Sequence, residues 1–462
     1  MRRLLLILLL FPCYAWAQQA PVRMVMDVRS THSDGAHSMD ALVSMARKRG
    51  VDVLAFGEHD RFSLCLGLDP APQILSYCMQ HPSLYTTGLA SFFADLARVR
   101  TTYPDMTFMA ATESTPGYYW SGIPFRDLTL HNAERHIIAL GLKRPVQVEA
   151  LPSYHLRHIR GIFNISMAFW LILVGSVLLV LFRRRKRAVA LLLVASFLAF
   201  LSTWLFKPKV DADMDFIRTA QQQGLFVIWA HPGTLSGVRS GPMGVKLDTP
   251  PYSQRVFHPL DGVVAEGFAA VYGDTDTNTE PGGLWDKYMV NYMLGLYDKP
   301  IWGVAAGDFH KQGESGEYLG NFPMDVWADG RTPADILAAM RKGHMVAWGM
   351  PKDRNLRVKS LFLEDTTGHQ LLPGDEITAP GQVVLHCSLE ERPVSVHPVD
   401  HQPLYAQIIM DGHVLAQPLL GVSQPLQETL QLAPGAHVIR LRIPAQHGIR
   451  METNPFLVRV VG

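Results

Sequence analysis

The sequence has little cysteine and little charge. Its four cysteines among 462 residues are scattered, which excludes a disulfide scaffold and a zinc site built from CxxC pairs. Charged residues make up only 18%, and 42 Lys and Arg against 41 Asp and Glu leave a net charge of +1. This balance excludes a disordered chain and gives no sign of a nucleic-acid partner.

Apolar residues and histidine are abundant instead. Hydrophobic residues make up 48% of the chain, and the mean hydropathy of +0.08 indicates that part of it lies in lipid. The length of 462 residues predicts two or three domains. The 19 histidines invite a search for metal ligands.

The first 17 residues have the pattern of an export signal. Arg2 and Arg3 precede the apolar run 4–11, and Ala15-Trp16-Ala17 is a typical cleavage site. We therefore expect residues 1–17 to be a signal peptide; an uncleaved anchor is the alternative. In an oxidising compartment Cys65 and Cys78 could form a disulfide, a pairing that spacing alone leaves open.

Two uncharged stretches in the middle of the chain predict a transmembrane hairpin. Residues 161–182 and 188–206 are each long enough to cross a bilayer, and the basic run 183–187 separates them. Five basic residues place that loop in the cytoplasm. The prediction is an inner-membrane protein tethered by two helices, with residues 18–160 and 207–462 on the periplasmic side.

Apolar runs of strand and helix length alternate on both sides of this insertion. Strand-like runs include 23–28, 107–112 and 225–230, and Ser38 and Pro333 stand at helix starts. This rhythm predicts an α/β fold with a parallel sheet or barrel, in two parts, 18–160 and 207–352. Short strand-like runs separated by Gly and Pro predict an antiparallel β-sandwich over 353–462.

Polar side chains gather where the apolar strands end. A single cluster of this kind is explained by ordinary exposure to solvent, because exposed polar residues are common. Several clusters at successive strand ends are typical of an active site on a barrel. The residues concerned are Asp27, Arg29, Glu58, His59, Glu113, His136, His231, Asp308 and His310.

With these motifs the chain resembles the polymerase-and-histidinol-phosphatase (PHP) family. The similarity covers residues 23–160 and 210–352. The matching motifs are Ser33-Asp34-Gly35, Glu58-His59, Glu113, His136, His231-Pro232-Gly233, Asp261 to Glu266, Trp285-Asp286 and Asp308-x-His310. The resemblance implies a distorted (β/α)7 TIM-like barrel, up to three metals, and phosphoester hydrolysis by a metal-activated water.

The chain departs from the family pattern at its first motif, where Asp27 and Arg29 replace a His-x-His pair. Asp27 can still bind a metal, but Arg29 cannot, because its guanidinium has no lone pair. Arg29 either replaces one metal electrostatically or binds substrate phosphate. We therefore expect one or two divalent ions, Zn, Mn or Fe, with Arg29 and Asp308 as catalytic residues. The expected metal ligands are Asp27, Glu58, His59, Glu113, His136, His231, Asp308 and His310.

The sequence thus predicts a metal-dependent phosphoesterase that faces the periplasm and acts on a phosphorylated small molecule or lipid. Two alternatives stay open. The first is a catalytically impaired PHP-like module that binds a metal or a ligand, with Arg29 marking the lost chemistry. The second is a structural protein of the cell envelope whose β-sandwich makes the contacts.

Overall fold

The chain is a mixed α/β protein. The computed structural model describes residues 20–67, 76–122, 126–154, 175, 177, 211–233, 237–241, 244–258, 262–272, 277–379, 381–394 and 403–461. The predicted signal peptide, residues 1–17, lies outside the described residues. The predicted spans 161–182 and 188–206 also lie outside them, apart from Gly175 and Val177.

The structure contradicts the predicted transmembrane hairpin and the inner-membrane localisation that depends on it. No helix among the described residues is long and apolar enough to cross a membrane. The longest of them, α3 (Leu89–Thr102), has 14 residues. At 1.5 Å per residue it spans about 21 Å, which is short of the roughly 30 Å of a bilayer core.

Within the described residues, seven strands form a ring. Neighbours in the ring are parallel, except that one strand, β8, runs antiparallel to both of its neighbours. In spatial order the strands are β1 (Val22–Val28), β2 (Val53–His59), β5 (Thr107–Ser114), β8 (Ile137–Leu142), β9 (Phe226–Trp229), β12 (Gly267–Val271) and β13 (Trp302–Ala305).

The ring closes between β13 and β1 through residues just beyond the strand ends. Phe309 forms a parallel bridge with Val28, and its backbone N–H donates to Asp27 O at 3.0 Å. The backbone N–H of Arg29 donates to Phe309 O at 2.9 Å. The segment that closes the barrel is therefore also the segment that carries the polar residues of the first and last strands.

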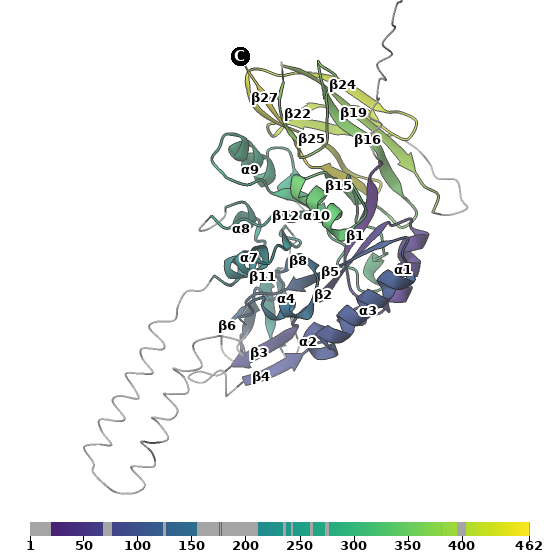
Figure 1. Ribbon diagram of the computed structural model, residues 1–462. Coiled ribbons are helices and arrows are strands. Elements are labelled where there is room, and N and C mark those ends of the chain that lie inside the picture. The colour runs from purple at the N-terminus through teal and green to yellow at the C-terminus, as the bar shows by residue number, and fades with distance from the viewer. Residues whose placement is uncertain are drawn as a thin grey trace, which may run out of the picture.

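Helices cover the outside of the ring (Figure 1). Sequence signals set their ends: Ser38 accepts from Ala41 N at the start of α1, and Thr332 and Asp335 form a capping box on α10, which spans the predicted residues. The described helices, besides α3, are α1 (Met39–Lys48), α2 (Leu84–Thr87), α4 (Pro145–Glu149), α7 (Ala212–Gln222), α8 (Ser253–Phe257), α9 (Leu284–Met293) and α10 (Pro333–Lys342).

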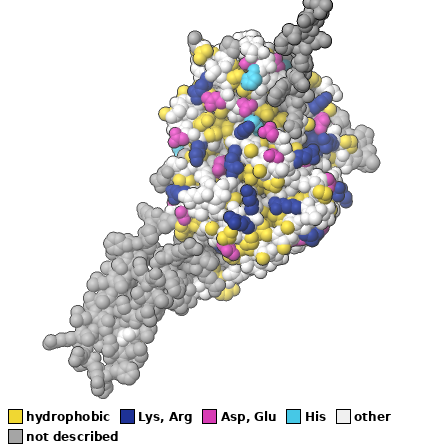
Figure 2. Space-filling view, in the orientation of Figure 1, with side chains coloured by type: hydrophobic (Ala, Val, Ile, Leu, Met, Phe, Trp, Pro, Cys, Tyr) yellow, Lys and Arg dark blue, Asp and Glu magenta, His cyan; other side chains and the backbone are white. Residues whose placement is uncertain are grey.

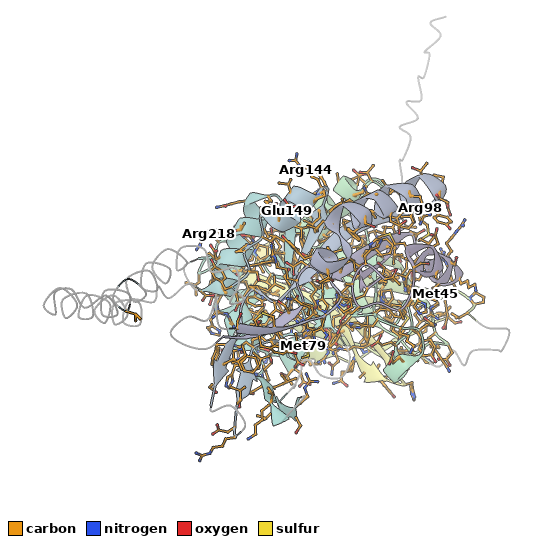
Figure 3. All side chains as sticks on the ribbon, turned by 90° about the horizontal axis from the view of Figure 1, so that it is seen from below. Met45, Met79, Arg98, Arg144, Glu149 and Arg218 are labelled. Carbon is orange, nitrogen blue, oxygen red and sulfur yellow. A yellow bond between two sulfur atoms is a disulfide. The ribbon has the colours of Figure 1, made fainter. Side chains whose placement is uncertain are left out.

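Charged residues mark the outer surfaces of these helices. Figure 3 labels Arg98 on α3, and Arg144 and Glu149 at the two ends of α4. In Figure 2 acidic and basic side chains are interspersed over the visible face. This mixture agrees with the net charge of +1.

The C-terminal part consists of two β layers around a second apolar core that includes Leu361, Leu385 and Ile443. One layer contains β16 (Leu356–Asp365), β17 (Gln370–Leu371), β19 (Gln382–Glu391) and β24 (Leu426–Gln431). The other contains β18 (Glu376–Ala379), β21 (Gln407–Met410), β22 (His413–Ala416), β25 (Gly435–Gln446), β26 (Ile449–Thr453) and β27 (Phe456–Val460). The short strands β20 (Leu404–Tyr405) and β23 (Leu419–Leu420) pair separately.

One feature of this part differs from the predicted antiparallel sandwich, and a second was not part of that prediction. Strand β18 pairs with β27 in parallel. The second layer is also continuous with the barrel sheet, because β14 (Pro323–Val326) pairs with β1, β15 (Met345–Gly349) pairs with β14, and β26 pairs with β15. The two cores are thus joined by one sheet.

Small sheets extend from the barrel at the end where its polar residues lie. One contains β6 (Tyr119–Ser121), β7 (Thr129–His131), β10 (Gly237–Ser240) and β11 (Lys246–Thr249). The other pairs β3 (Ser63–Gly67) with β4 (Ser76–Gln80), where Cys65 and Cys78 lie directly opposite and form a disulfide. Cys387 is a free, buried thiol.

Buried ion pairs connect the barrel to the β domain. Arg440 of β25 is 1% exposed and bonds to Asp286 of α9 and to Glu452 of β26 at 2.7–3.1 Å. Arg23 of β1 bonds to Asp325, which also accepts from Trp348 Nε1. Charges this deep are tolerated only when paired.

Breaking the pair between the domains should destabilise the protein. Asp286→Asn leaves Arg440 with less compensation in a buried position, so we expect a loss of about 3 kcal/mol in the free energy of unfolding. Asp105→Asn is the matched control: it breaks a pair with Arg47 in which both side chains are half exposed, and should cost under about 1 kcal/mol. Urea unfolding measures both, and equal losses would contradict the assignment.

Candidate metal centre

Most of the predicted polar residues meet at one end of the ring. Asp27, His59 and Glu113 lie at the carboxyl ends of β1, β2 and β5, and His231 and Asp308 follow β9 and β13. His136 directly precedes β8, which runs in the opposite direction and therefore starts at this same end. Strand polarity thus brings residues from 27 to 310 into one cluster.

Three groups of side chains in the described part of the chain can each hold a metal ion. In every group one ligand atom per residue lies within 4.8 Å of the others. Group A is Asp34, His59 and His310; group B is Glu113, His136 and His231; group C is Asp27, Glu113 and Asp308. Mixed imidazole and carboxylate ligands suit Zn, Mn or Fe.

Backbone strain is concentrated in this cluster. Asp27, His231 and Asp308 have φ values of 62°, 28° and 44°, a region that residues other than glycine seldom adopt. Gly57 lies beside Asp27, and a Cβ there would come within 2.7 Å of Asp27 Oδ1. Strain of this kind persists at sites where the surrounding structure enforces a side-chain position.

Arg29 occupies the centre of group C. Its side chain is fully buried, and Nη2 donates to Glu113 Oε2 and, at 2.7 Å, to Asp308 Oδ1. Nη1 donates to Gly57 O, and Nε donates to His310 Nε2 at 3.1 Å. The guanidinium therefore bonds to two carboxylates of group C and also contacts group A.

The charge of Arg29 sets the protonation of its neighbours. Burial acts to raise the pKa of Glu113, but Arg29 and His136 hold it well below its usual value. Burial and then the charge of Glu113 raise the pKa of Asp27 well above its usual value. Burial, reinforced by Arg29, lowers the pKa of His59 to about 3, which keeps its imidazole neutral and able to bind a metal.

The residues of groups A and B fit a metal ion. In group A, Asp34 Oδ2 lies 3.6 Å from His59 and 3.4 Å from His310, while Glu113 Oε1 of group B is buried and has no hydrogen-bond partner in the described structure. A buried carboxylate oxygen without a partner is costly unless a cation completes it. Group C fits less well, because Arg29 already bonds to Glu113 and Asp308, although Asp27 Oδ1 is also without a partner.

The structure does not bring Glu58 to the other predicted ligands. Its carboxylate accepts from the backbone N–H of Ser30 at 3.1 Å and from the hydroxyls of Ser30 and Ser33. Glu58 belongs to none of the three groups. Its bonds instead hold the loop that follows β1, the loop from which Arg29 and Asp34 reach the centre.

Two residues of the site were not predicted. Asp34 belongs to the motif Ser33-Asp34-Gly35, and it lies 3.6 Å from His59 and 3.4 Å from His310. The sequence signal for Asp34 is this motif itself, which follows the first strand. Tyr272, which donates to Asp308 Oδ2 at 2.8 Å, follows β12 with no distinctive motif.

Comparisons with known proteins found structural similarity alone. No family model and no curated protein matches the sequence. A two-domain protein from Bacteroides vulgatus, containing a predicted PHP-like metal-dependent phosphoesterase, matches with 11% identity, a TM-score of 0.37, and coverage of 91% of this chain and 90% of that one. An amidohydrolase from Chromobacterium violaceum matches with 17% identity, a TM-score of 0.28, and coverage of 63% and 88%. At such scores the argument rests on the geometry of the site.

Group B combines Glu113 and His136, which precede residues 155–210, with His231, which follows them. Loss of any one of these ligands should therefore reduce metal binding at the same site. We expect His231→Ala to reduce bound metal as strongly as Glu113→Ala, at least 10–100-fold in affinity. Asp105→Asn, at a half-exposed residue that pairs with Arg47 and belongs to none of the three groups, is the control and should keep its metal. Elemental analysis after dialysis measures all three, and unchanged metal in His231→Ala would refute a shared site.

The neutral state of His59 predicts a pH dependence in the metal-free protein. Between about pH 6.5 and pH 3 the unfolded chain binds a proton at His59 that the folded chain does not. Stability should therefore fall as the pH falls, by up to about 1.4 kcal/mol per pH unit from this group. His59→Gln should make the slope shallower in urea titrations with chelator. An unchanged slope would contradict the assignment.

Proposed function

We propose that the protein is a metal-dependent hydrolase of phosphoesters. The supporting observation is that groups A and B, each with two histidines and a carboxylate, flank the buried guanidinium of Arg29. Two neighbouring sites of this composition match the needs of phosphate hydrolysis better than those of a purely structural protein. The substrate class we expect is a phosphorylated small molecule or lipid.

In this proposal Asp34, His59 and His310 hold one divalent ion, and Glu113, His136 and His231 hold another. Zn, Mn or Fe bound there would polarise the phosphate and lower the pKa of a water molecule. The chain itself contributes ligand geometry. The strained backbone at His231 and the buried position of Glu113 fix those side chains before any ion binds.

Arg29 takes the place of a third ion rather than binding substrate. Its side chain has no exposed surface, and its three nitrogens already donate to protein acceptors. A guanidinium bound in this way has no pair of N–H groups free to bind a phosphate in a bidentate manner. Its positive charge offsets Asp27, Glu113 and Asp308, as a cation in group C otherwise would.

Asp308 is the carboxylate of group C that can act on a water molecule. Its side chain is 21% exposed, whereas those of Asp27 and Glu113 are fully buried. Burial acts to raise the pKa of Asp308, but Arg29 holds it below its usual value, so it stays ionised. We assign it the role of accepting a proton from the attacking water.

The burial of Arg29 also favours a second function. If hydrolysis requires an ion in group C, the same guanidinium marks an impaired module that binds metal or ligand without turnover. The two functions differ in one measurement. The hydrolase should release p-nitrophenol from p-nitrophenyl phosphate or its bis-ester, lose this activity with chelator, and regain it with Zn, Mn or Fe.

His136→Ala should abolish that activity by removing a ligand of group B, and Asp105→Asn, outside the three groups, serves as the control that keeps the ligands. Activity that survives chelation and the loss of His136 would overturn the proposal. Metal binding without any hydrolysis of either ester would select the impaired module.

Replacing Arg29 tests its role as a substitute for a metal. The double variant Asp27→His with Arg29→His supplies two neutral imidazoles and removes a cation that repels a metal by about 4 kcal/mol per unit charge at an effective dielectric of 20. We expect the metal content to rise from two ions per chain towards three, as measured by elemental analysis. Three tightly held ions in the unmodified protein would show this reasoning to be wrong.

A further inference from the structure

A cavity of about 320 Å³ lies at the same end of the barrel as the metal centre. Gly117 and Tyr119 follow β5, which carries Glu113, while Asn132 and Arg135 lead into β8 next to His136. Its other lining residues are Tyr118, Tyr154, Asp211, Ala212, Asp213 and Arg255. Its volume is within the range of small-molecule sites, about 300–1,000 Å³.

The charged groups of the cavity pair with one another. Arg135 Nη1 and Arg255 Nε bond to the same oxygen of Asp213 at 2.6 and 2.7 Å, and Arg255 Nη2 bonds to Asp211. Two arginines and two aspartates leave no formal charge to attract a free ion. The walls therefore favour a neutral ligand that forms hydrogen bonds.

Aromatic rings supply the rest of the lining. Tyr119 is 56% exposed, and its ring stacks on His131 with centroids 4.6 Å apart and planes 14° apart. The Tyr154 hydroxyl donates to Asp215, and the Tyr118 hydroxyl donates to Ser63 O. With these hydroxyls engaged, the tyrosines offer their rings to a ligand.

The His131 ring that stacks on Tyr119 is held in place by two other side chains. His131 lies 2.7 Å from Ser121 Oγ through Nε2 and 3.1 Å from Asp248 through Nδ1. All four side chains lie on one face of the small sheet, because Tyr119, His131 and Asp248 are directly paired and Ser121 is two residues from Tyr119. The distances also match those of a nucleophile, a base and an orienting carboxylate. Reaction at Ser121 is therefore one arm of the test below.

We infer that this cavity binds a neutral sugar ring, the alcohol part of the phosphoester substrate. The inference rests on the proposed function, since it assigns the leaving group of that reaction. A sugar has apolar C–H faces that pack on an aromatic ring such as Tyr119, and hydroxyls that both donate and accept. Arg255 and Asp211, which pair with each other and are 24% and 30% exposed, offer donors and an acceptor side by side, which suits vicinal hydroxyls.

The test measures sugar binding apart from hydrolysis. The full chain, stripped of metal by chelator, is applied to an array of neutral glycans, and a retained glycan is titrated by calorimetry. Tyr119→Ala should weaken binding about tenfold, the equivalent of one lost aromatic contact. Tyr119→Phe should restore it. Tyr77→Ala removes a tyrosine that is 69% exposed on β4, outside the cavity, and should bind like the unmodified chain.

Three results would overturn the inference: no glycan retained, equal binding by Tyr119→Ala, or binding of adenosine in preference to every glycan. Labelling of Ser121 by diisopropyl fluorophosphate, absent in Ser121→Ala, would assign covalent chemistry to this face and overturn it as well. Sugar binding without hydrolysis of any phosphoester would refute the proposed function and leave the cavity assignment standing. Hydrolysis without sugar binding would do the reverse.

Discussion

The contacts of Arg29 join the closure of the barrel to the charge balance of its polar end. Its backbone N–H bonds to Phe309 O, where the last strand meets the first. Its side chain lies within 3.7 Å of the carboxylates of Asp27, Asp34, Glu113 and Asp308. Four carboxylates this close would repel strongly in a low-dielectric interior, and one fixed guanidinium makes their burial tolerable. The fold of the site therefore depends on a cation that belongs to the chain.

The positive charge of Arg29 also helps to keep groups A and B able to bind a metal ion. A protonated imidazole cannot bind an ion, and burial together with Arg29 lowers the pKa of His59 to about 3. Glu113 is shared between groups B and C: one oxygen bonds to Arg29, and the other lies 3.2 Å from His136 and 3.5 Å from His231. Arg29 thus neutralises the centre while leaving ligand atoms on both sides of it.

The β domain is part of the structural frame of the barrel. The barrel sheet runs through β14 and β15 into β26, and buried Arg23 and Arg440 tie the two cores together. Two motif residues that the resemblance emphasised serve this frame. Asp286 pairs with Arg440, and Glu266 accepts from Val227 N and Gln221. In this chain both acidic residues therefore serve the architecture.

Features that depend on local order could be predicted from the residues alone: the helix that begins after Ser38, α10, and the polar residues at the ends of the apolar strands. Periodicity and capping act over a few residues, so they are legible in one dimension. Which of these polar residues come together as ligands depends on the three-dimensional fold, because the hydrogen-bond donors nearest to a carboxylate determine whether it is free to bind a metal. The hydroxyls of two serines in a neighbouring loop donate to the Glu58 carboxylate, whereas Asp34 lies with His59 and His310 in one possible metal site. The hairpin that hydropathy predicts at 161–206 is contradicted, because no helix of the described residues is long and apolar enough to cross a membrane.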